Sequence, residues 1–100
     1  MIADFFLGFI KIHILYHASK EPVFGLELIK ELSRHGYHIS PGTLYPILHR
    51  LAEADHLSTQ KKIVNGKVRK YYRITKKGRI ALKECKHKIH ELVDEVMRER

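Results

Sequence analysis

Apolar residues recur at helical spacing over the first 18 residues of the chain. They form two neighbouring stripes, Phe5, Phe9, Ile12 and Tyr16 in one and Phe6, Ile10 and Ile14 in the other. This periodicity predicts a helix over about residues 3–18. Because such a helix is apolar on most of its circumference, it must be covered on two sides. A chain of 100 residues has few elements to do this, so we expect one cover to come from another subunit.

Two shorter helices are predicted next, over residues 25–35 and from residue 41 to about residue 54. Gly36 follows the first of them, where a left-handed cap is typical. Ser40 suits the N-cap of the second and Pro41 its first position. The core-facing positions are Leu28, Ile29 and Leu32 in the first helix and Leu44, Ile47, Leu48 and Leu51 in the second. The short turn between them indicates a helix-turn-helix, and in that motif the later helix enters the major groove of DNA.

After Leu57 the apolar period changes from 3.6 to 2, which predicts strands. Asn65-Gly66 is a strong hairpin signal. A two-residue turn there pairs Ile63 with Val68, Lys61 with Lys70, Thr59 with Tyr72, and Leu57 with Ile74. The order of three helices and a hairpin predicts a mainly α fold with a small β-hairpin, a winged helix-turn-helix.

A last helix is predicted from Thr75, its N-cap, to the C-terminus. Its apolar positions are spaced 3, 4, 3, 4, as in a heptad seam. They are Leu82, Cys85, Ile89, Leu92 and Val96, and the neighbouring Val93 and Met97 make this apolar face wider. The helix is about 40 Å long, more than the rest of the chain can cover. We therefore expect one domain, 1–100, in which residues 1–74 form the helix-turn-helix and wing and residues 75–100 a dimerisation helix. The alternative is packing against the chain's own first helix alone.

The net charge of +8 is concentrated in one segment. Residues 56–83 hold ten Lys or Arg and no Asp or Glu, whereas the other 72 residues have a net charge of −2. A solvated face usually mixes signs, so this asymmetry favours a polyanionic partner over a basic surface kept for solubility. Lys61 opposite Lys70 is unfavourable for stability, and a bound polyanion would neutralise the pair.

Four segments together resemble the PadR family of transcriptional regulators: residues 24–28 (Phe-Gly-Leu-Glu-Leu), residues 39–48, Arg50-Leu51 and residues 69–78. The resemblance implies a winged-helix dimer, usually a repressor, in which the last helix packs against the partner's N-terminal helix. It also implies pseudo-palindromic operators bound through paired recognition helices and wings.

Carried over to this chain, the resemblance implies that Ser40, Thr43 and Tyr45 contact phosphates or base edges. It places Lys67, Arg69 and Lys70 along the DNA backbone. The chain resembles the short subfamily, without a separate effector domain. Some relatives stack flat aromatic ligands on tryptophan, and this chain has none. The resemblance leaves room for a small-molecule effector that relieves repression, and the sequence does not identify it.

The predicted site residues fall into three sets. On the recognition helix they are Ser40, Thr43, Tyr45, Pro46, His49 and Arg50. On the wing they are Lys61, Lys62, Lys67, Arg69 and Lys70. At the dimer interface they are Phe5, Phe9, Ile12, Tyr16, Leu82, Cys85, Ile89, Leu92 and Val96.

Histidines are numerous, eight in 100 residues. His13 and His17 are spaced i, i+4, and His87 and His90, i, i+3, lie near Cys85. If the first and last helices pack together, these side chains could converge on a transition metal or a haem. Solvated histidines are the simpler interpretation, because no carboxylate–histidine motif or cysteine pair supports a site. We therefore expect no metal and no cofactor.

Other functional classes find little support in the sequence. Gly-rich phosphate loops, nucleophile elbows and metalloprotease motifs are absent, so we expect no enzyme. The single cysteine allows no intrachain disulfide and fits a reducing cytoplasm. The first apolar stretch is too short and too polar to span a membrane. The prediction is a dimeric regulator that binds double-stranded DNA, with a winged-helix protein–protein adaptor as the alternative.

Overall fold

The computed structural model describes the backbone of residues 2–98 and the side chains of residues 4–98. Its elements are α1 (Ile2–Lys20), β1 (Val23–Phe24), α2 (Gly25–Arg34), α3 (Pro41–Glu53), β2 (Leu57–Val64), β3 (Lys67–Ile74) and α4 (Lys76–Met97). The predicted order of helices and hairpin is confirmed, and the fold is a mainly α winged helix-turn-helix. Two differences are a first helix that begins earlier and ends later than predicted, and the additional strand β1.

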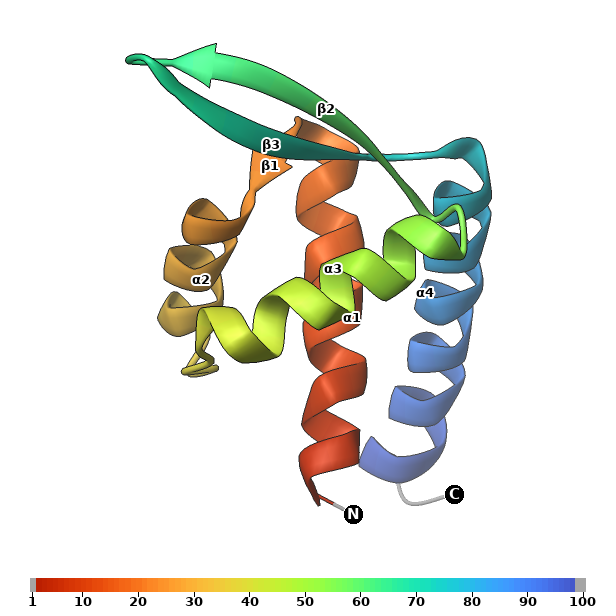
Figure 1. The fold of residues 1–100 in the computed structure, drawn as a ribbon. Helices are drawn as coiled ribbons and strands as arrows, with labels where there is room; N and C mark the ends of the chain where they lie inside the picture. Colours follow the sequence, from red (N-terminus) through yellow and green to blue (C-terminus); the bar gives the residue numbers. More distant parts are fainter. Residues whose placement is uncertain (1, 99–100) are drawn as a thin grey trace.

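Helices α1 and α4 run antiparallel side by side, and α2 lies on the opposite side of α1 (Figure 1). Helix α3 packs against α2 and against β2. The hairpin β2–β3 projects from the end of the molecule opposite the start of α1 and the end of α4 (Figure 1). The hairpin therefore lies at one end of the molecule, and the start of α1 and the end of α4 lie at the other (Figure 1).

The hairpin has the predicted register, with all four expected pairs present between β2 and β3. Asn65 and Gly66 have φ values of 52° and 77°, as the two central residues of a type I′ turn require. Strand β1 pairs with β3, so β3 is central in a three-stranded antiparallel sheet. With only two residues, β1 is too short to show an alternating pattern, so it could not be predicted from the sequence.

One hydrophobic core joins all four helices to the base of the sheet. The predicted inner stripes are buried, except that Ile29 is only partly buried against the core. Leu57, Tyr72 and Ile74 are buried and anchor the base of the hairpin to the core. Leu82, expected at a dimer interface, is instead 5% exposed within the chain's own core. It lies beside residues of α1, so only the part of the heptad seam that follows Leu82 is available to a partner.

The ends of the helices are fixed as their sequences predict. Ser40 Oγ accepts a hydrogen bond from the Thr43 backbone N–H at 3.3 Å, and Thr75 Oγ1 accepts one from the Gly78 N–H at 2.9 Å. After α2, Gly36 has a φ of 87°, the left-handed cap conformation. These caps set where the turn of the helix-turn-helix begins and where α4 leaves the sheet.

Gly78, in the first turn of α4, allows that helix to pass close to the chain that follows α3. A Cβ at this position would overlap the His56 carbonyl oxygen and lie 2.7 Å from Ile74 Cγ1. We expect Gly78→Ala to lower the free energy of unfolding by about 1–3 kcal/mol through overpacking, despite the higher helix propensity of alanine. Urea unfolding measures the change.

Gly42→Ala is the matched control, because a Cβ there meets only Ser40 Oγ, at an ordinary 3.7 Å. This variant should be as stable as the wild type or slightly more stable. Equal stabilities for Gly78→Ala and Gly42→Ala would contradict the close approach at Gly78.

Candidate nucleic-acid interface

The solvent face of α3 carries every residue predicted for the recognition helix. Those residues, Ser40, Thr43, Tyr45, Pro46, His49 and Arg50, are exposed, while the other face is buried in the core. Pro46 lies inside α3 without ending it. The helix therefore presents one unbroken outer face of about three turns.

The N-terminus of α3 is suited to an anion. Ser40 and Thr43 hydroxyls lie within 3.4 Å of one another, and no acidic residue occupies the first turn. Pro41 has no N–H, and the N–H groups of Thr43 and Leu44 are bonded to Ser40. The two hydroxyls and the Gly42 N–H are therefore the groups that meet an anion at this partly positive helix end. Toward the other end, His49 Nε2 pairs with Glu53 Oε1 at 3.1 Å, so the positive character of this face is strongest at its start.

Tyr45 is placed by two neighbouring elements. Its ring lies against Gly25 at the start of α2, where a Cβ would come within 2.6 Å of Tyr45 Cζ. Burial, followed by the nearby Tyr45, raises the pKa of Tyr72 on β3. The phenol is still 42% exposed. Tyr45 thus joins α2, α3 and the sheet, and the glycine that makes room for it is a positioning residue that sequence analysis missed.

The basic side chains of the wing divide between the two faces of the hairpin. Lys61 and Lys70 are direct cross-strand partners on the face that carries Tyr72, and Lys70 Nζ lies 5.6 Å from the centre of the Tyr72 ring. Because Tyr45 lies against Gly25 and the preceding strand β1 pairs with β3, α3 is connected to the wing through β1.

The opposite face of the wing is held by aromatic rings. Arg69 lies over the Phe24 ring at 4.1 Å and Lys62 Nζ over the Tyr71 ring at 5.1 Å. Lys67 is exposed beside the Asn65-Gly66 turn. Strands β2 and β3 contain no acidic residue, so both faces are positive and only Arg69 is half-buried.

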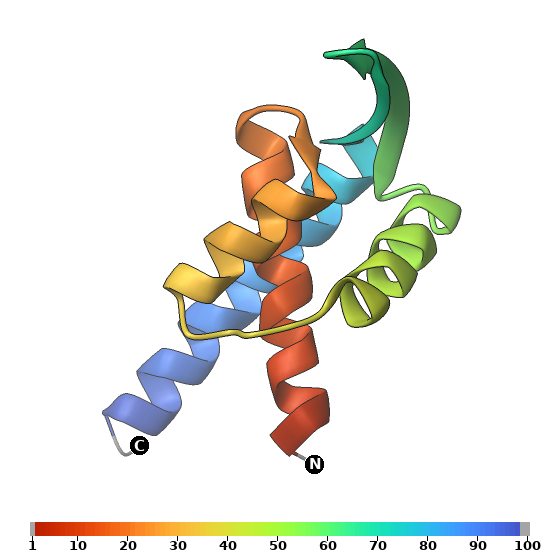
Figure 2. The same ribbon diagram turned by 60° about the vertical axis from the view of Figure 1, so that its left-hand side comes forward.

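The residues predicted for a dimer interface differ in exposure. Phe5, Tyr16, Leu92 and Val96 are exposed, whereas Phe9, Ile12, Cys85 and Ile89 are half-buried. Phe6, Val93 and Met97 add to the exposed apolar surface. Figure 2 shows α1 and α4 diverging toward the ends that carry most of these side chains.

The histidines do not converge as the sequence suggested. His87 pairs with Glu91 at 3.0 Å on the outside of α4. Among residues 4–98, the one group of possible metal ligands is His13, His17 and His35. Burial, then the positive charges of His35 and His17, lowers the pKa of His13, and the Glu31 carboxylate acts in the opposite direction. His35 is the C-cap of α2. Residue spacing along the sequence does not reveal that this end of α2 lies beside His13 and His17 of α1.

Comparison with known proteins gives a consistent result. The model of the transcriptional regulator PadR-like family matches residues 14–84. The transcriptional regulator Rv3488 of Mycobacterium tuberculosis is 48% identical over 88 residues, which are 88% of this chain and 82% of the relative.

In the described part of the chain, none of the helices has the length and apolar character needed to cross a membrane.

Solved structures of similar proteins share the fold over nearly the whole chain. A PadR family transcriptional regulator from Eggerthella lenta matches with a TM-score of 0.85 and 34% identity, covering 98% of this chain and 87% of that one. A PadR-like regulator from Bacillus cereus matches with a TM-score of 0.82 and 35% identity, covering 91% and 90%.

Proposed function

This chain belongs to the PadR-like family of transcriptional regulators, and from that premise we propose that it is a dimeric repressor that binds a pseudo-palindromic operator. The members found by comparison are regulators and not enzymes. The finer proposal concerns which surfaces meet DNA and which meet a second subunit.

One observation carries the DNA-binding proposal, the continuity between the solvent face of α3 and the basic wing. Tyr45 lies against Gly25, directly after strand β1, which pairs with β3, and Lys70 on β3 lies over the Tyr72 ring. A single duplex laid along this surface would meet the recognition helix and the wing together, as in other winged helix-turn-helix proteins. The wing contributes positive charge without any intervening carboxylate.

We assign the two parts different roles. The wing lysines and the start of α3 would supply phosphate contacts, which position the protein but carry no sequence information. Tyr45, His49 and Arg50 are exposed on α3 beyond its first turn, and we assign them to contacts with base edges. Operator choice would then rest with α3, and general affinity with the wing.

The dimer proposal rests on the exposed apolar ends of α1 and α4. Phe5 packs edge-to-face against Phe6 and Phe9, with ring centres 5.7 and 4.7 Å apart, yet remains 57% exposed. Exposed apolar side chains also remain at the end of α4, so both helix ends leave apolar surface uncovered, and such surface marks an interaction site. The occupant we propose is the same pair of helix ends in a twin subunit, related by a two-fold axis.

The test of DNA binding is a gel-shift titration with the region upstream of the protein's own gene, against a random duplex of equal length. We expect the upstream DNA to bind at least about 10³-fold more tightly, and both affinities to fall steeply with salt as counterions are released. Equal affinity for both duplexes at moderate salt would favour the adaptor alternative.

A further inference from the structure

Three imidazoles from two helices meet on the side of α1 that faces α2. His13 and His17 lie one turn apart on α1, and His35 is the residue that caps the C-terminal end of α2. The rings of His13 and His35 stack with centres 4.6 Å apart. One nitrogen of each residue lies within 4.8 Å of the nitrogens of the other two.

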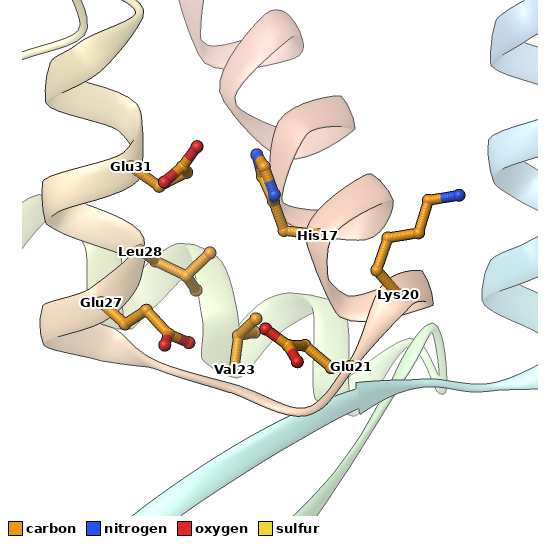
Figure 3. A pocket seen from close by; sticks show the side chains of 7 residues that line it. All are labelled: His17, Lys20, Glu21, Val23, Glu27, Leu28 and Glu31. Carbon is orange, nitrogen blue, oxygen red and sulfur yellow. The ribbon is translucent and has the colours of Figure 1, made fainter.

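His17 supplies the observation that points to a ligand. Its Nε2 is buried and has no hydrogen-bond partner among the described residues. An unsatisfied buried polar atom costs about 1–3 kcal/mol, and imidazole nitrogen is a common metal ligand. Figure 3 shows His17 on α1 and Glu31 on α2 both pointing into the space between the two helices.

The charged residues around His17 are mostly acidic, which favours a bound cation. The His17 side chain borders a small cavity of about 140 Å³ that is also lined by Glu21, Glu27 and Glu31 and by one cation, Lys20. Glu27 Oε1 is buried without a hydrogen-bond partner among the described residues.

We propose that His13, His17 and His35 bind one divalent transition-metal ion of the zinc, nickel and copper class. Three neutral imidazoles suit these ions, and a tetrahedral ion leaves a fourth position for water or for the Glu31 carboxylate. Nitrogen ligands on such an ion lie about 3.4 Å apart at bond lengths of about 2.0–2.1 Å. The present nitrogen–nitrogen distances are at most 4.8 Å, so each pair of nitrogens must approach by about 1.4 Å or less. Rotation of the imidazole rings provides this movement.

The ion would join two parts of the proposed repressor. His13 and His17 belong to α1, which carries half of the proposed dimer surface. His35 immediately precedes Gly36 and the turn into α3. An ion held by all three fixes the end of α2 to α1, and so couples the subunit arrangement to the position of the recognition helix. This regulatory step rests on the proposed function, whereas the metal site itself does not.

The first experiment titrates the whole protein with Co²⁺ and follows its visible d–d absorption, then displaces the Co²⁺ with Zn²⁺. We expect one ion per chain. His35→Asn should weaken binding by more than about 100-fold, since loss even of an outer-shell partner typically costs 10–100-fold. This variant keeps its fold because the His35 side chain is exposed. His90→Asn, which removes another exposed histidine from α4, is the matched control and should bind like the wild type.

Direct binding and regulation give separate outcomes. Absence of Co²⁺ absorption, or equal loss in His35→Asn and His90→Asn, overturns the site. The three rings would then be a packing cluster with Tyr37, whose ring centre lies 5.5 Å from that of His13. Binding that His35→Asn abolishes supports it. A change in operator affinity on adding Zn²⁺ to the wild type, lost in His35→Asn, supports the regulatory step. If Zn²⁺ leaves the operator affinity of the wild type unchanged, only the regulatory step is overturned. The proposed function is tested separately, by DNA binding in the absence of metal.

Discussion

Replacing both Lys61 and Lys70 by glutamine should lower the affinity for double-stranded DNA by about 10²–10³-fold near 0.1 M salt. A dimer loses four positive charges from the wing face that carries Tyr72. Each lost phosphate contact removes about one unit from the slope of log affinity against log salt. Because phosphates carry no sequence information, binding to operator and to random DNA should weaken by similar factors. Fluorescence anisotropy over a salt series measures both quantities.

Loss of folding does not explain such a result. Lys61 and Lys70 are exposed and directly opposite each other in the hairpin, and like charges in that position are destabilising. The double variant should therefore unfold at the same or a slightly higher temperature than the wild type.

Lys83→Gln with Lys88→Gln is the matched control. It removes the same charge from two exposed positions of α4, outside the wing and the recognition helix. We expect at most a small effect of reduced net charge on DNA affinity. Equal losses from the wing pair and the α4 pair would mean that binding follows net charge alone, and the wing would have no specific role.

The parts of this fold that the sequence predicts are those set by local rules. The register of β2 and β3 follows from the Asn65-Gly66 turn, because a two-residue loop fixes every pair along the hairpin. The caps at Ser40 and Thr75 follow in the same way from side chains that bond within one turn. These features depend on neighbours in sequence, which a single chain displays directly.

The parts that the sequence could not predict are contacts between distant elements. Strand β1 exists because β3 offers it a free edge, and its two residues show no period of their own. Gly25 matters because Tyr45, 20 positions later, fills the space above it. His35 meets His13 and His17 only because α2 packs beside α1. In the seam of α4, likewise, spacing does not reveal that Leu82 is buried within its own chain.

Replacing Leu92 and Val96 by glutamate should convert the protein to a monomer at micromolar concentration. The two side chains are 54% and 56% exposed on the outer half of α4, so the fold of each chain should survive. At a two-fold interface each substitution appears twice, and burying four unpaired carboxylates costs far more than an apolar contact provides. Sedimentation velocity measures the state of association. Operator affinity should fall by at least about 10²-fold, because the two recognition helices no longer bind as one linked unit.

His87→Glu with His90→Glu is the control for the added charge. Both histidines are exposed on α4, and they occupy outer positions of the heptad rather than its apolar seam. Each substitution changes the charge of α4 by the same amount as the leucine and valine substitutions do. This control should remain a dimer and retain its affinity for the operator. A dimer in the Leu92 and Val96 variant would show that the two subunits meet elsewhere, since the apolar end of α4 would then be dispensable for association.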